Sequence, residues 1–335
     1  MNIDLASKLS HYLSLRYPEV VVSNFKFLAS GFESEIYVFR MHFSSSEEKD
    51  YILRLFTGDG ATEKLIREAT GLTVLQKADY PVPGLFLQEP NVSMLGRPFE
   101  ITEKLDGQAL WPMLTTVTPE QGKRLLSRFG VLLSQLHKLD WHSFTPDVAI
   151  LEDEPLSLLE TVISQYRALY TKYQLNGFLE VTDWLDLHKH EINVQPALVH
   201  QDFHANNVLL CSKDQLYVID WTQFAITDFR VDLCWTLLIM GDLGNPEWGR
   251  QILHAYTTDR KSSPDQLEYF QVLVYMKLLA STVIAFTFGP QEVGLTSGAV
   301  RLTREQRTVY KQLAQRLRHL TGLTIPELLD VLERI

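Results

Sequence analysis

The feature that most constrains the fold of this chain is an ordered set of polar residues within an apolar stretch between residues 198 and 221. In chain order its members are His200, Asp202, Asn207 and Asp220. Apolar runs bracket them, and the polar segment 211–215 is typical of a short connection between two strands. The pattern therefore predicts an antiparallel hairpin, with Asp202 and Asn207 before its first strand and Asp220 after its second.

The chemistry of this set is that of a magnesium site used in phosphoryl transfer. Carboxylate and amide oxygens are the ligands that Mg²⁺ takes together with phosphates and water. An Asp, an Asn five residues later and a second Asp after a hairpin have the spacing of the phosphoryl-transfer template. The alternative is that Asp202 and Asn207 only cap turns, because both residue types form local hydrogen bonds there. The complete ordered set favours the catalytic interpretation.

The segment 200–207, His-Gln-Asp-Phe-His-Ala-Asn-Asn, and Ile-Asp-Trp at 219–221 resemble the aminoglycoside phosphotransferase and choline kinase superfamily, a branch of the protein-kinase-like fold. That family usually has His-Gly-Asp-x-His-x-x-Asn, followed by Ile-Asp-Phe or Ile-Asp-Trp. This chain departs at Gln201, usually Gly, and at residues 205–206, often Pro-Gly; neither position carries chemistry. The resemblance implies the following roles: Asp202 as the catalytic residue, Asn207 and Asp220 as the Mg²⁺ ligands, and His200 in support.

Composition limits the class of protein. The chain has 335 residues, enough for one large or two ordinary domains. Its net charge of −10 argues against a nucleic-acid partner, because phosphates demand a basic face. Two cysteines make neither a disulfide framework nor a zinc site. The beginning of the sequence has an early acid and no apolar core, so it does not resemble a secretory signal. We therefore expect a cytoplasmic protein.

The apolar segment 270–288 is about as long as a bilayer-spanning helix. Lys277 lies near its middle, and a central Lys opposes insertion by about 2.5–3.5 kcal/mol. Ser263 and Pro264 are typical of the start of a helix in a water-soluble protein. We therefore expect a buried helix over 264–288 and no membrane partner.

The first hundred residues predict a small lobe built on an antiparallel sheet. Leucines at four-residue spacing predict an amphipathic helix over 3–16. Runs rich in β-forming residues predict strands. The expected strands are 20–28, 35–43, 51–56, 85–88 and 97–104, with a helix over 61–77.

Several residues of this lobe suit a nucleotide. Gly31 and Ser34, in the first turn, could bring a backbone N–H and a hydroxyl to phosphates, although such a glycine often serves only the turn. Arg54 occupies the position where the kinase-like fold places a phosphate-binding Lys, and its planar fork binds phosphate bidentately. Glu68, in the pattern Arg-Glu-Ala-x-x-Leu, is its expected partner. The alternatives are that Arg54 is a solvated charge on the strand and that Glu68 is an ordinary acid on the surface of the helix.

The run 101–107, Ile-Thr-Glu-Lys-Leu-Asp-Gly, resembles the hinge between the lobes of the family. By that match, backbone groups of Glu103 and Leu105 hydrogen-bond the nucleotide base, and Thr102 lies behind it. The resemblance therefore implies a nucleotide-binding lobe of residues 1–105. A helical lobe of residues 106–335 would carry the catalytic hairpin and the acceptor site.

The remainder of the chain predicts helices. The expected ranges are 118–139, 155–174, 182–192, 246–256, 299–320 and 326–334. Asp228 and Asp232 resemble the family segment that opens a helix after the hairpin. We expect Asp228 to brace the catalytic loop and Asp232 to lie at the helix start, with capping as the alternative for both. We expect His137 to be structural.

The resemblance covers residues 25–240 and implies a bilobal α+β protein-kinase-like fold, with an N-terminal antiparallel sheet, one main helix and a mainly helical C-terminal lobe. The implied reaction transfers the γ-phosphoryl of ATP or GTP, with Mg²⁺, to a hydroxyl of a small acceptor, in a monomer or homodimer. Acceptors of such enzymes include aminoglycosides, macrolides, choline-like amino alcohols, homoserine and sugars. A protein kinase is disfavoured because the segment after Asp220 is short and lacks Ala-Pro-Glu. A non-catalytic nucleotide-binding module is the alternative from another class.

Overall fold

The computed structural model describes residues 2–30, 34–43, 48–145, 148–295 and 297–335. The chain forms two compact units. The first contains residues 1–109 and 207–224, and the second contains residues 110–206 and 225–335. Strands dominate the first unit and helices the second, as expected for an α+β protein. The expected lobe boundary at residues 105 and 106 stays a prediction.

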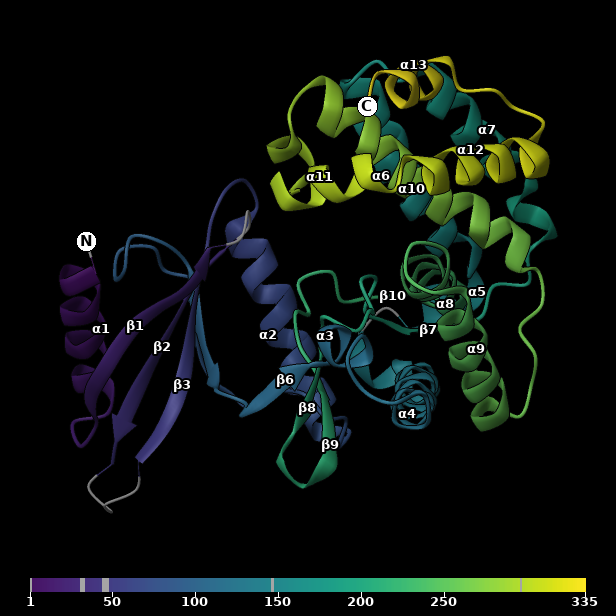
Figure 1. Cartoon of the computed structure of the whole chain (residues 1–335). Coiled ribbons are helices and arrows are strands. Elements are labelled where there is room, and N and C mark those ends of the chain that lie inside the picture. Colours follow the sequence, from purple (N-terminus) through teal and green to yellow (C-terminus); the bar gives the residue numbers. More distant parts are fainter. Residues whose placement is uncertain (1, 31–33, 44–47, 146–147, 296) are drawn as a thin grey trace. The chain divides into compact units, whose positions relative to one another are not determined.

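An antiparallel sheet forms the centre of the first unit (Figure 1). In the described residues its strand order is β1-β2-β3-β5-β4. The strands are β1 (Val21–Ser30), β2 (Ser34–His42), β3 (Glu48–Phe56), β4 (Leu85–Glu89) and β5 (Phe99–Glu103). Each lies within a few residues of its expected range, because alternating apolar residues specify strands and their faces.

The two faces of this sheet differ in chemistry. One face carries apolar side chains such as Phe39 and Leu53, which cluster with Leu9 and Leu13 of α1 (Asn2–Arg16). Successive strand residues point to opposite faces, so Arg54 of β3 lies on the other side. Helix α2 (Ala61–Lys77) packs against β3, β4 and β5 and has the predicted bounds. Its buried stripe is Leu65, Glu68, Ala69, Gly71, Leu72 and Leu75.

A second, small sheet of the first unit contains the predicted hairpin. Strand β8 (Val208–Cys211) pairs antiparallel with β9 (Gln215–Val218), and β6 (Gly107–Ala109) pairs with the other edge of β8. The short connection, η3 (Ser212–Asp214), turns tightly because two of its residues have left-handed backbone angles. The hairpin thus leaves Asn207 just before β8 and Asp220 just after β9.

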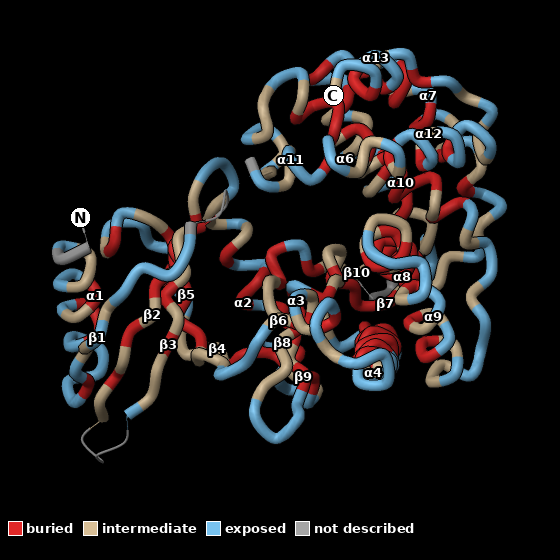
Figure 2. The backbone as a smooth tube through the Cα atoms, in the orientation of Figure 1, coloured by how far each residue is buried: buried red, intermediate tan, exposed pale blue. Residues whose placement is uncertain are grey.

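The second unit consists mainly of helices. Its two described strands, β7 (Pro196–Val199) and β10 (Ala225–Asp228), pair antiparallel. The α-helices are α3 (Leu110–Leu114), α4 (Pro119–Lys138), α5 (Val148–Asp153), α6 (Leu156–Lys172), α7 (Asn176–His188), α8 (Phe229–Leu237), α9 (Pro246–Arg260), α10 (Leu267–Thr287), α11 (Ser297–Glu305), α12 (Arg307–Thr321) and α13 (Pro326–Arg334). Short helical turns are η1 (Trp141–Phe144), η2 (Lys189–Glu191), η4 (Leu238–Asp242) and η5 (Pro290–Val293). Figure 2 shows buried residues along α4 and α8.

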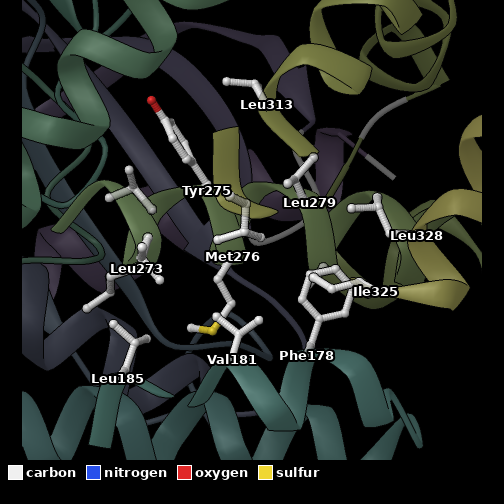
Figure 3. Packing of buried hydrophobic residues seen from close by; sticks show 14 of the residues in the cluster. Phe178, Val181, Leu185, Leu273, Tyr275, Met276, Leu279, Leu313, Ile325 and Leu328 are labelled. Carbon is white, nitrogen blue, oxygen red and sulfur yellow. The ribbon is translucent and has the colours of Figure 1, made fainter. Parts of the chain in front are cut away.

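Helix α10 lies at the centre of the largest apolar cluster (Figure 3). Among the described residues it is the one helix long and apolar enough to cross a membrane, but 67% of its most apolar window is buried in the protein. Its side chains meet residues of α7, α12 and α13. The labelled contacts in Figure 3 include Phe178, Val181, Met276, Leu279, Leu313 and Leu328. A helix that is apolar all round belongs in such a core, which confirms the predicted buried helix.

Several helix boundaries differ from the expected ones, and α9 extends to Arg260, four residues beyond its expected end. Helix α10 begins at Leu267 rather than at Pro264, because the guanidinium of Arg230 binds Asp265 and fixes the preceding segment outside the helix. Helix α7 begins at Asn176, six residues before the expected start. The expected helix over 299–320 is divided at Gln306, whose side-chain amide donates to the carbonyl of Leu243 at 2.6 Å.

The core contacts of α7 give a test of the fold. Leu185→Ala should lower the free energy of unfolding by about 2–5 kcal/mol, because it leaves a cavity at a fully buried site. Leu187→Ala is the matched control, since Leu187 lies two residues along the same helix with 74% of its surface exposed. Denaturant unfolding of both variants checks the difference. Equal losses would contradict the packing described for α7.

Candidate active site

The charged centre of the first unit is Arg54. Its guanidinium donates to both carboxylate oxygens of Glu68, at 2.8 and 2.9 Å, and to Oδ1 of Asp220 at 3.0 Å. Its Nε donates to the hydroxyl of Ser34 at 3.0 Å. The structure therefore brings together four predicted site residues, which come from β2, β3, α2 and the segment after β9.

Local structure explains how the two carboxylates reach Arg54. Glu68 lies on the buried stripe of α2, and it also accepts a hydrogen bond from the backbone N–H of Trp221 at 3.2 Å. Asp220 has a left-handed backbone with φ 67°, a conformation that Asp tolerates better than most side chains. The hydroxyl of Thr222 donates to the same Oδ1 of Asp220 at 3.0 Å. The hairpin end and α2 are thus joined through one guanidinium.

Burial and charge shift the acid–base behaviour of this cluster. Burial raises the pKa of Glu68 to about 7, against the opposing charge of Arg54. Burial disfavours the charged form of Arg54, but the charges of Glu68 and Asp220 outweigh it and raise the Arg54 pKa above its ordinary value. A cation that stays charged beside two acids is suited to hold phosphate oxygens.

Glu100, on β5, is a site residue that the sequence analysis missed. It is 2% exposed, and its Oε2 has no hydrogen-bond partner within the described part of the chain. Burial, followed by the charge of Glu68, raises its pKa well above the usual range. Glu100 is paired across the sheet with Arg54, so the two share a face. An acid inside the apolar run 99–101, in register with Arg54, was the signal that could have identified it.

Asn207 and Asp220 lie at the same end of the β8–β9 hairpin. The carbonyl of Asn207 accepts the N–H of Ile219 at 2.9 Å, and Val208 is paired with Val218 in the adjoining ladder. Across the residues that the structure describes, no group of three or more His, Cys, Asp and Glu side chains is placed to hold a metal alone. An amide and a carboxylate are nonetheless the partial donor set that Mg²⁺ completes with phosphates and water.

The segment expected to contact the nucleotide base begins in β5. Thr102 is buried in β5, and the N–H of Glu103 is occupied by the carbonyl of Gly84 at 2.8 Å. Glu103 is the last residue of β5, and Leu105 follows the strand. Gly31 lies outside the described residues. The roles of these residues stay predictions.

In the second unit, Asp202 is held from several sides. Its Oδ1 accepts the indole N–H of Trp235 at 3.0 Å, and its Oδ2 lies 3.4 Å from Nε2 of His204. Its backbone N–H donates to Nδ1 of His200 at 3.2 Å, which gives His200 a supporting position. Burial alone would raise the Asp202 pKa, but the hydrogen bond from His204 and the charge of Lys277 hold it well below the usual range. Asp202 is therefore a fixed, ionised carboxylate.

The acid that holds the loop before β8 by hydrogen bonds is Asp232, not Asp228. The buried carboxylate of Asp232 accepts the N–H groups of His200 and Gln201, both at 2.7 Å. Asp228 instead caps the start of α8 and pairs with Arg230. Asp232 lies in the first turn of α8, as expected, and it also makes the contacts to the loop that were expected of Asp228. For Asp228, the alternative interpretation, that it only caps the helix, is the one that the structure supports.

His137 is structural, as expected. It is buried between Asp232, 3.4 Å from its Nε2, and the hydroxyl of Tyr256, 2.9 Å from its Nδ1. Burial lowers the pKa of His137, so the ring is neutral at physiological pH. It supports the carboxylate that holds the loop.

The site and the fold together define a class, the phosphotransferases with a protein-kinase-like fold. The family model described as "Phosphotransferase enzyme family" matches residues 24–269, and this chain belongs to that family. It is therefore an enzyme, a small-molecule phosphotransferase that acts on a hydroxyl group. No curated protein matches the sequence.

Three solved structures show the similarity of fold. A candidate aminoglycoside phosphotransferase from Ralstonia eutropha JMP134 has a TM-score of 0.67 and 14% identity, covering 95% of this chain and 98% of the other. The ternary complex of APH(2″)-IIa with streptomycin and ATP has a TM-score of 0.55 and 16% identity, with 91% and 98% covered. Choline kinase LicA from Streptococcus pneumoniae has a TM-score of 0.55 and 15% identity, with 94% and 99% covered. These likenesses confirm the predicted kinase-like fold.

The buried acid of β5 leads to a prediction about pH. Because the folded-state pKa of Glu100 is raised, its contribution to stability is complete below the unfolded pKa of about 4.3 and is lost as pH rises through the folded pKa. Glu100→Gln removes that loss. The variant should match wild type at pH 4, below that unfolded pKa, and melt roughly 2–4 °C higher at pH 8, equivalent to about 1 kcal/mol.

Differential scanning calorimetry at the two pH values measures this difference. Glu103→Gln is the control, because Glu103 lies on the same strand with its side chain 39% exposed. A Glu100→Gln variant that melts at or below the wild-type temperature at pH 8 would show that Glu100 is charged and paired in the folded protein.

Proposed function

We propose that this enzyme transfers the γ-phosphoryl group of ATP or GTP to a hydroxyl of a small molecule. The observation that carries the proposal is the binding of Arg54 to both Glu68 and Asp220. This arrangement places a permanent cation beside a carboxylate of the hairpin end. Such positioning and charge neutralisation account for most of the rate of phosphoryl transfer.

Asn207 and Asp220 would hold Mg²⁺. Their fit rests on the chemistry of the donors, an amide oxygen and a carboxylate at one end of the hairpin. When bound, Mg²⁺ neutralises charge on the phosphates. Arg54 would bind phosphate oxygens, and Ser34, hydrogen-bonded to Arg54, lies at the beginning of β2 beside the turn predicted to face the phosphates.

Asp202 would accept or orient the proton of the acceptor hydroxyl. Its lowered pKa makes it a weak base in the ground state, so its first task is to orient the hydroxyl. Proton transfer becomes favourable late, when the attacking oxygen has begun to bond to phosphorus in a loose transition state. Trp235 holds the carboxylate for this task through the indole N–H.

The donor base would lie against Glu103 and Leu105, with Thr102 behind it. A nucleotide donor is supported by the ATP-containing complex among the similar structures. The carbonyl of Glu103 and the N–H of Leu105 form an acceptor and donor pair along one backbone segment. Such a pair can hydrogen-bond the edge of a purine.

The acceptor class follows from the family only in outline. Similar structures include a streptomycin complex and a choline kinase, so aminocyclitols and amino alcohols are the first candidates. Macrolides, homoserine and sugars complete the set to test. The decisive experiment is a nucleotide-consumption screen over these acceptors with ATP and with GTP. A cytoplasmic location and a monomeric or homodimeric state stay predictions.

Asp202→Asn should lower turnover by about 10²–10⁴-fold, the usual contribution of a positioned acid or base. Nucleotide affinity and the melting temperature should change little, because the Asn oxygen can still accept the Trp235 N–H. Steady-state kinetics on the best acceptor of the screen, together with nucleotide titration, measures both. The control is Asp214→Asn in the exposed hairpin connection. Near-normal turnover of Asp202→Asn would remove Asp202 from the mechanism.

Asp220→Ala should abolish the part of nucleotide protection that depends on Mg²⁺. The physical reason is that the ion joins the phosphates to the protein through this carboxylate. A thermal-shift assay with nucleotide, with and without Mg²⁺, measures the effect. If Mg-nucleotide stabilises Asp220→Ala as well as wild type, the metal assignment is wrong.

A further inference from the structure

The residue before Asp202 has an unfavourable backbone. Gln201 adopts φ 63°, in the left-handed region that glycine enters at no cost and other residues enter rarely. A strained residue persists only where its surroundings fix it. Because Gln201 is joined directly to Asp202, the backbone conformation of Gln201 determines the position and direction of the Asp202 side chain.

Both backbone groups of Gln201 are held by side chains from helices. Its N–H donates to Oδ1 of Asp232, on α8, at 2.7 Å. Its carbonyl accepts from Nζ of Lys277, on α10, at 3.2 Å. The two contacts fix opposite ends of the strained residue.

Lys277 also contacts the group behind Asp202. Its Nζ lies 4.1 Å from the ring centroid of Trp235, a cation–π distance, and the indole N–H of Trp235 donates to Asp202 at 3.0 Å. Lys277 lies among apolar neighbours on α10, where burial lowers its pKa. Placing a cation there opposes folding, so a purely structural role would be filled better by an apolar residue.

We propose that Lys277 is a positioning residue for Asp202. It locks the Gln201 peptide in its left-handed conformation and holds the Trp235 indole against the Asp202 carboxylate. The catalytic consequence rests on the proposed function. We call the hydrogen bond from Lys277 to the Gln201 carbonyl the clamp. The clamp does not depend on the proposed function, because it is a property of the folded chain alone.

The kinetic test uses Lys277→Met, which keeps an apolar stem and removes the charge and the donor. Its kcat should fall about 10–100-fold, as expected when a reacting group is misplaced by a fraction of an ångström to an ångström. The KM for nucleotide should stay unchanged, because Lys277, on α10, contacts the loop that carries Asp202 and none of the described residues assigned to the nucleotide. Lys277→Arg keeps a cation and a donor and should recover most of the lost kcat.

The specific test is a double-mutant cycle with Gln201→Gly. Glycine adopts the left-handed conformation without a clamp, so Lys277→Met should lower kcat less in the Gln201→Gly background than in the wild-type background. The same cycle is measured by denaturant midpoints, with no substrate present. There too, the change in stability caused by Lys277→Met should be less unfavourable when residue 201 is glycine than when it is glutamine.

Lys189→Met is the matched control. Lys189 is a buried lysine of the same unit that pairs with Glu160 at 2.7 Å and Asp186 at 2.8 Å. Its loss should lower stability equally in both backgrounds and leave kcat unchanged. This separates loss of a buried lysine in general from loss of the clamp.

Each outcome of these experiments either supports or overturns the proposed role of Lys277. Wild-type kcat in Lys277→Met, or equal effects of Lys277→Met in both backgrounds, would overturn the proposal. If wild type consumes no nucleotide with any acceptor, the proposed function fails and the denaturation cycle alone decides the clamp. If Lys277→Met does not fold while Lys277→Met/Gln201→Gly does, that rescue supports the clamp. If neither folds, a cycle with Lys277→Gln replaces it, and equal effects there overturn the proposal.

Discussion

The buried guanidinium of Arg54 is the interaction on which the first unit depends. With its side chain 13% exposed, Arg54 needs partners, because an unpaired buried charge is far more costly than the pair is favourable. Its partners come from α2 and from the end of the hairpin, segments far apart in the sequence. Removing one member of such a pair typically costs about 3–5 kcal/mol. The charge therefore fixes the relative position of the strand, the helix and the hairpin end within this unit.

In the second unit, the residues that follow β7 form a short polar loop without regular secondary structure, and side chains hold it in place. Helix α8 supplies Asp232, Trp235 and Thr236, three residues that share one helical face because they are three and four positions apart. They bind, respectively, the N–H groups of residues 200 and 201, the carboxylate of Asp202, and the carbonyl of Phe203 at 2.8 Å. These contacts supply hydrogen-bond partners to backbone groups of a segment that lies outside helices and strands. Helix α8 thus supplies most of the side-chain contacts that hold the loop, and Lys277 of α10 adds another.

Much of this could be predicted from the sequence, and the failures have physical causes. The hairpin and α2 were found because apolar periodicity and turn chemistry are local properties. Spacing alone does not show that Asp232 rather than Asp228 holds the loop, because both acids lie at the start of the same helix and only tertiary contacts tell them apart. The start of α10 depends on Arg230, which is distant in sequence. In the sequence, Lys277 opposes membrane insertion of its apolar segment. No sequence pattern indicates that its partner is the carbonyl of Gln201.

The choice of arginine at position 54 follows from the number of partners it serves. A guanidinium presents donors in a planar fork, so Arg54 binds Glu68 through Nη1, Asp220 through Nη2 and Ser34 through Nε at the same time. A lysine has one nitrogen at the end of a flexible stem and would have to reach all three partners from one point. Burial raises the pKa of Glu100 on the same face, and the charges of Glu68 and Asp220 raise it further against the opposing charge of Arg54. The cation of Arg54 and the raised pKa of Glu100 therefore both reduce the excess negative charge of this cluster.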